Sequence, residues 1–124
     1  MGLDMYAMTT TITPDAPVDF TIADDIPVTR LYYWRKHPDL HGWMEQLYRA
    51  KGGIEAAFNG DKLVLTLADL DALETAVRGQ SLPYTVGFFF GESEPEFAED
   101  DLEFIAKARD AIRDGLTVYY DSWW

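Results

Sequence analysis

The side chains best suited to chemistry lie in one stretch, residues 32–43, which reads YYWRKHPDLHGW. Aromatic rings can stack on a base, and guanidinium and ammonium groups can hold phosphate. We therefore predict a site for a small anionic ligand, with a nucleotide as the best fit. The candidate ligand-binding residues are Tyr33, Trp34, Arg35, Lys36, His41, Trp43 and Phe89.

The charge distribution supports a small anion and argues against a nucleic acid polymer as partner. The chain of 124 residues carries a formal net charge of −12, and such a surface repels a long phosphate backbone. Five of its ten lysines and arginines nevertheless fall in residues 28–53, opposed only by Asp39 and Glu45. A basic segment in an acidic protein can admit a small anion while excluding polyanions.

Residues 29–34 contain one β-branched and three aromatic residues, enough to predict a strand. Alternation would place the even-numbered residues from Arg30 to Lys36 on one face, and Leu31, Tyr33 and Arg35 on the other. A purely structural interpretation also stands, in which the rings are buried and the cations extend to solvent.

A helix follows this strand. Pro38 suits its first position, and Gly52-Gly53 suits its end. His37 and His41 are four residues apart, and with Glu45 they suggest a crude metal site. Because Pro38 begins the helix, His37 should lie at or before the cap and off that face. We therefore expect no metal and no cofactor.

The remaining patterns predict one α+β domain over residues 1–124, with a mainly antiparallel sheet of about four to five strands and about three helices packed on it. Thr66 and Asp69 form the pattern of a capping box. The other expected strands are Leu3–Met8, Val18–Ile22, Lys62–Thr66, Thr85–Phe90 and Leu116–Tyr120, and the other helices run from Thr66 to Gly79 and from Pro95 to Asp114.

The segment Gly87–Gly91 reads GFFFG. In a strand, Phe88 and Phe90 would face the core with Val86. Phe89 would share its face with glycines alone, which lets a ligand, helix or backbone approach closely.

Several classes of site have no sequence support. The chain has no cysteine, which excludes disulfides and thiolate zinc sites and fits a reducing cytosol. No apolar run approaches the ~20 residues of a membrane span, and no signal peptide is visible, so we expect no membrane partner. Walker A, GxGxxG and GxSxG motifs are absent. Ser81, Ser93 and Ser122 lie in ordinary turn or tail contexts, and we assign no catalytic residue.

An acidic run over residues 92–103 precedes and begins the third expected helix. Carboxylates there complement the helix dipole and favour solubility. Alternatively, the run could imitate nucleic acid and occupy a DNA-binding protein.

Four separated motifs resemble those of a family of small bacteriophage proteins. They are MGLDMY at Met1–Tyr6, YWRK at Tyr33–Lys36 followed by His41 and Trp43, GFFFG at Gly87–Gly91, and the tail YYDSWW at Tyr119–Trp124. Leu40 stands where the family usually has isoleucine. His37-Pro38 replaces a small residue and asparagine, whereas His41 matches the family pattern.

The resemblance implies a phage origin and action in the cytoplasm of the infected bacterial host. Family members are often labelled phosphoglycerate kinase, but such a kinase is a two-domain enzyme several times longer, and we reject that activity. Small phage proteins without catalytic motifs often counter host defences. One strategy is a sponge that sequesters the nucleotide signals on which those defences depend.

Three hypotheses result. The first is a sponge that binds a small anionic nucleotide without chemistry. The second is a protein-binding inhibitor or DNA mimic that uses the acidic surface. The third is a small enzyme that cleaves a nucleotide, with His41 as general acid or base. The aromatic end Trp123-Trp124 also needs cover, which a second copy in a homo-oligomer could supply.

Overall fold

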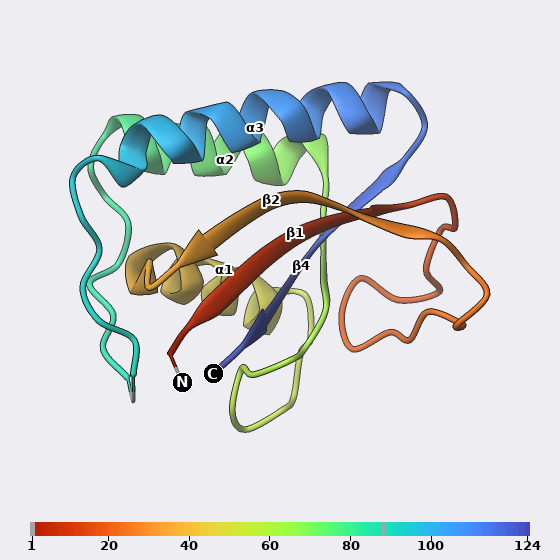
Figure 1. The fold of residues 1–124 in the computed structure, drawn as a ribbon, viewed down its shortest axis with the longest axis horizontal. Coiled ribbons are helices and arrows are strands. Elements are labelled where there is room, and N and C mark those ends of the chain that lie inside the picture. The colour runs from red at the N-terminus through yellow and green to blue at the C-terminus, as the bar shows by residue number, and fades with distance from the viewer. Residues whose placement is uncertain (1, 88) are drawn as a thin grey trace.

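The computed structural model describes residues 2–87 and 89–124 and shows an α+β fold (Figure 1). Three helices accompany a four-stranded antiparallel sheet, as the sequence predicts. Along the chain the elements are β1 (Asp4–Thr10), β2 (Val28–Arg35), α1 (Pro38–Ala50), β3 (Leu63–Leu65), α2 (Leu67–Arg78), α3 (Phe97–Arg113) and β4 (Thr117–Trp123).

The sheet has the order β2-β1-β4-β3, which places the first and last strands side by side at its centre. Alternate residues of β1, among them Met5 and Ala7, are fully buried, whereas Asp4 and Tyr6 between them are partly exposed. Helix residues pack on the buried face, where Phe104 of α3 contacts Trp34 and His41 of α1 contacts Tyr120. On the opposite face, which we call the open face, Tyr33 is exposed and Tyr6 is partly exposed.

A β-bulge corrects the predicted face of Arg30. Ala7 pairs with Tyr32 and Met8 pairs with Arg30, so Leu31 is an extra residue in β2. An extra residue reverses the alternation beyond it. Arg30 therefore lies on the open face, opposite to Tyr32 and Trp34.

The local signals for the starts of the first two helices are confirmed, whereas the third helix begins at Phe97 and not at Pro95. Thr66 and Asp69 form the capping box at the start of α2, and Gly79 caps its end. Pro38 begins α1, with His37 as its N-cap residue. Helices α2 and α3 lie side by side over the sheet (Figure 1). No helix within residues 2–87 and 89–124 is long and apolar enough to cross a membrane.

Two predicted strands are wrong. In the segment Val18–Ile22, only Val18 bridges to a strand residue, Leu63, and Asp19 has a left-handed backbone that ends the pairing. The described residues of Thr85–Phe90 form no strand, and Phe88 lies outside them. There the Thr85 N–H donates to Asp39, and the Phe90 N–H donates to Gly87 in a tight turn. In this segment, backbone N–H groups therefore donate to a side chain and within a turn, and not to a neighbouring strand.

Gly42 lies in the middle of α1 against Thr85. A Cβ built on Gly42 would overlap the Thr85 side chain. Helix propensity alone favours alanine over glycine by about 1 kcal/mol. We expect Gly42→Ala instead to lower the free energy of unfolding by about 1–3 kcal/mol, because the contact must be relieved by moving the 85–90 segment. Urea denaturation measures this, and Gly42→Ala combined with Thr85→Ala should recover most of the loss.

Candidate functional site

The strand β2 sends its two central predicted ligand residues to opposite faces of the sheet. Trp34 is 2% exposed, and its Nε1–H donates to Asp101 at 3.1 Å. Its ring packs edge-on against Phe104. Tyr33 is 41% exposed on the open face. Trp34 is thus held in the core, and Tyr33 is the ring that a ligand can reach.

An aromatic and cationic platform surrounds Tyr33 on the open face. The Tyr33 and Tyr6 rings lie 5.4 Å apart between centroids. The Arg30 guanidinium lies 5.4 Å from the Tyr33 ring centre and 6.0 Å from that of Tyr6. Trp123, which pairs with Asp4 across β1 and β4, is 68% exposed on the same face. The platform therefore offers exposed rings for stacking beside cations.

Asp4 organises the end of this platform. Its carboxylate accepts the Tyr33 hydroxyl at 2.6 Å and Arg35 Nη1–H at 2.8 Å. The hydrogen bond from Tyr33, followed by the contacts with Arg35, lowers the Asp4 pKa below its ordinary value. Asp4 is thus an anion near neutral pH and fixes the positions of both neighbours.

The side chains of Arg35 and Lys36 meet at one corner of the molecule, which we call the basic corner: Gly2, Arg35, Lys36 and Gly91. A Cβ at Gly2 would press on both side chains, and a Cβ at Gly91 would press on Lys36. Arg35 and Lys36 also line a surface hollow of about 560 Å³, whose far wall is formed by residues 92–95 and Phe97. Residues from all four sequence motifs meet in this region. Gly2 belongs to the first motif, Arg35 and Lys36 to the second, and Gly91 to the third. Trp123 of the fourth motif pairs with Asp4, which also pairs with Arg35.

Lys36 and Phe89 share an unusual backbone. Their φ angles are 56° and 64°, in the left-handed region that bulky residues rarely adopt. Phe89 is half exposed, two residues from Gly91, so its loop passes beside Lys36. Residues held in such conformations are enriched at ligand sites. Trp43, in contrast, is partly buried and packs against the core from α1.

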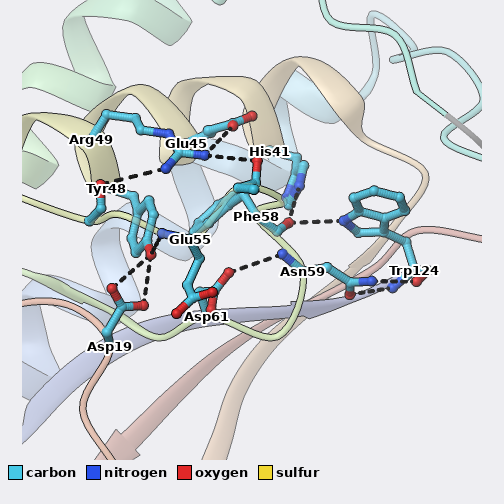
Figure 2. Close-up of polar contacts among 12 residues, drawn as sticks. Asp19, His41, Glu45, Tyr48, Arg49, Glu55, Phe58, Asn59, Asp61 and Trp124 are labelled. Carbon is cyan, nitrogen blue, oxygen red and sulfur yellow. Dashed lines mark hydrogen bonds and ion pairs between the residues drawn. The ribbon is translucent and has the colours of Figure 1, made fainter.

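His41 of α1 belongs to a buried hydrogen-bond network. Figure 2 shows His41 and Trp124 directed at the Phe58 carbonyl, which accepts His41 Nε2–H at 3.1 Å and Trp124 Nε1–H at 2.9 Å. His41 Nδ1 then accepts the Tyr120 hydroxyl at 2.6 Å. Burial lowers the His41 pKa to about 4. A neutral, 1% exposed imidazole with both nitrogens engaged stabilises the fold, and its ring packs edge-on against Phe90, which precedes Gly91.

The structure also assembles three residues that the sequence interpretation set aside. His37 Nε2 lies 2.9 Å from Asp101 Oδ2, and His37 Nδ1 lies 2.6 Å from Ser93 Oγ. Asp101 is buried, although the acidic run was interpreted as solvated. The sequence does contain a signal for the burial of Asp101, because this residue falls on the apolar stripe of α3 between Phe97 and Phe104.

The two histidines lie in separate networks, and residues 2–87 and 89–124 contain no group of three or more His, Asp or Glu side chains that could hold a metal ion. The C-terminal Trp124 is covered by its own chain, since it packs edge-on against Phe90. Of the two adjacent tryptophans Trp123 and Trp124, Trp123 is the exposed one.

Comparisons with known proteins do not identify a function for this chain. No protein-family model, curated protein or solved structure matches the chain.

Proposed function

We propose that the protein binds a small anionic nucleotide at the basic corner and the adjoining platform, and sequesters it without chemistry. In this proposal it is a phage anti-defence protein that acts in the cytoplasm of the infected bacterial host. The observation that carries the binding proposal is the exposed Tyr33 ring beside Arg30, with its hydroxyl on the Asp4 carboxylate that Arg35 also binds, in a protein of net charge −12. The phage context rests on the resemblance of the four motifs.

The ligand would place its base on Tyr33 and its phosphate against Arg35 and Lys36. A base stacked on an aromatic ring contributes roughly 1–3 kcal/mol, and a charged hydrogen bond roughly 1.5–3 kcal/mol. Micromolar binding needs about 8 kcal/mol after association costs. Stacking and two phosphate contacts give a gross total of about 4–9 kcal/mol, from which association costs of several kcal/mol are subtracted. Micromolar binding therefore requires further contacts, which Phe89 and Arg30 would supply. Glu92 and Glu94 on the far wall of the hollow disfavour a longer polyanion.

The first test is calorimetric titration with a panel of mononucleotides and cyclic di- and trinucleotides. We expect at least one to bind, and Tyr33→Ala to raise its Kd about 5- to 150-fold, the equivalent of roughly 1–3 kcal/mol of stacking. Arg35→Ala should weaken binding to a similar degree. Asp4→Asn should strengthen it about fivefold, because it removes a unit charge that contributes roughly 1 kcal/mol at about 4 Å in water.

Matched controls are available in the same chain. Tyr84 is an exposed tyrosine outside the platform, and Arg113 lies at the far end of α3. Tyr84→Ala and Arg113→Ala should leave the Kd unchanged. Equal effects of Tyr33→Ala and Tyr84→Ala would reject the platform, and no binding by any nucleotide would reject the proposal. The bound nucleotide should be recovered intact after heat denaturation; an altered mass would reject sequestration without chemistry.

A further inference from the structure

Ser93, His37 and Asp101 lie in a line that three separate segments bring together. Ser93 comes from the loop before α3, His37 from the N-cap of α1, and Asp101 from the second turn of α3. The Ser93 Oγ to His37 Nδ1 distance is 2.6 Å, and the His37 Nε2 to Asp101 Oδ2 distance is 2.9 Å. All three residues line one cavity of about 330 Å³.

The hydrogen bonds around Asp101 determine the direction of the others. Its Oδ1 accepts Trp34 Nε1–H at 3.1 Å, and its Oδ2 faces His37 Nε2. With Asp101 ionised, both oxygens accept, so Nε2 carries the proton of a neutral His37. Nδ1 is then an acceptor, and the Ser93 hydroxyl donates to it. These are the roles of a nucleophile, a general base and an orienting carboxylate, with the two imidazole nitrogens exchanged relative to the Ser-His-Asp triad of serine proteases.

Ser93 keeps an electron pair for attack. A hydroxyl oxygen has two lone pairs. One accepts the Asp39 N–H at 3.0 Å, in the first turn of α1, and the other is available to a substrate. The N-terminus of α1 also carries partial positive charge, which favours a developing oxyanion nearby. A capping role for Ser93 would account for the Asp39 contact, but it requires neither His37 nor a buried Asp101.

The cavity indicates the class of substrate. Its wall is mostly apolar, and the carboxylates of Asp39 and Glu94 also line it and disfavour an anionic acyl group. The apolar lining comprises Val77, Leu82, Pro95, Phe97 and Ala98.

We propose that Ser93, His37 and Asp101 form a catalytic triad that hydrolyses small neutral esters with an apolar acyl group. Ser93 Oγ bonds to the acyl carbon, and its proton passes to His37 Nδ1. The bond between the acyl carbon and the alcohol oxygen then breaks, and the alcohol leaves with that proton. Water attacks the acyl-serine, gives a proton to His37 and releases the acid, while Ser93 Oγ regains the proton. Asp101 stabilises the imidazolium at each step.

This activity goes beyond nucleotide binding at the basic corner, and Ser93 and Phe97 also line the hollow beside Arg35 and Lys36. The two proposals fail separately, because a covalent adduct at Ser93 reports on hydrolysis and the calorimetric Kd reports on nucleotide binding.

The experiment treats the full chain with a small alkyl fluorophosphonate, in which Ser93 Oγ would displace fluoride from phosphorus. We expect one adduct per chain by intact mass, mapped to Ser93 by peptide mass spectrometry. Ser93→Ala should remove the adduct, whereas Ser81→Ala and Ser122→Ala should label like the wild type. His37→Gln should slow labelling and hydrolysis of p-nitrophenyl butyrate by at least about 100-fold, the usual contribution of a general base.

The wild-type protein alone can overturn the proposal, because absence of an adduct at Ser93 under excess reagent contradicts it. Should His37→Gln fail to fold by circular dichroism, Asp101→Asn takes its place, since it retains the shape of the side chain. Labelling of a folded His37→Gln or Asp101→Asn at the wild-type rate would show that Ser93 reacts without His37 and Asp101, and would overturn the triad.

Discussion

Trp34→Ala is expected to lower the free energy of unfolding by about 3–5 kcal/mol, whereas Tyr33→Ala should cost about 1 kcal/mol or less. The two aromatic residues are adjacent, but Trp34 is 2% exposed and packs on Phe104, and Tyr33 is 41% exposed. Removing the indole leaves a cavity between β2 and α3 and also withdraws the Nε1–H donor from Asp101. Urea denaturation followed by circular dichroism measures both variants.

Trp34→Phe separates the two contributions in Trp34→Ala. It retains most of the ring volume but removes the donor to Asp101, which should cost about 1–3 kcal/mol. The effects on nucleotide binding should run in the opposite order, with Tyr33→Ala the more damaging variant and Trp34→Phe close to wild type. Similar losses of stability for Trp34→Ala and Tyr33→Ala would contradict the assignment of the two rings to opposite faces.

Acidification from pH 7 to pH 4 is expected to destabilise the protein by about 3 kcal/mol through His41 alone. Burial lowers its pKa from an ordinary 6.5 to about 4. Above pH 6.5 neither state binds the proton, and the full stability is present. Between pH 6.5 and 4 only the unfolded chain binds it, so stability falls as the pH falls. The difference in pKa corresponds to about 3 kcal/mol at about 1.4 kcal/mol per unit.

His41→Gln isolates this contribution, because glutamine does not titrate and can still contact Phe58 and Tyr120. The difference in unfolding free energy between wild type and His41→Gln should shrink by about 3 kcal/mol from pH 7 to pH 4. Burial raises the pKa values of Asp61 and Asp121, which favours the folded state in acid, but both proteins share that effect. A pH-independent difference would show that His41 titrates normally.

The elements predicted correctly depend on short-range signals. Pro38 and the Thr66–Asp69 capping box determine helix starts through contacts within a few residues. The strand propensity of residues 29–34 predicts β2 in the same way, although a bulge breaks the alternation within it. The Thr85–Phe90 strand was wrong because its β propensity had no neighbouring strand to satisfy the backbone, and Asp39, distant in sequence, took the Thr85 N–H.

The sequence grouped Tyr33, Arg35 and Lys36 with Trp34 and could not separate the exposed side chains from the buried one. One extra residue in β2, Leu31, moved Arg30 to the open face, and only the pairing register of β1 and β2 reveals such a bulge. Phe89 was predicted as a ligand residue from a strand. Its loop instead passes beside Lys36 because Gly91 lets the Lys36 side chain approach.

By itself the sequence determined that this is one α+β chain with a strongly acidic composition and a basic, aromatic segment running from a strand into a helix. Those properties follow from composition and from periodicity over a few residues. Only the tertiary structure decided which of those side chains are exposed, and that Ser93, His37 and Asp101 meet. Ser93 and Asp101 lie 56 and 64 residues from His37, and contacts at such separations depend on how the helices pack on the sheet, which no local pattern specifies.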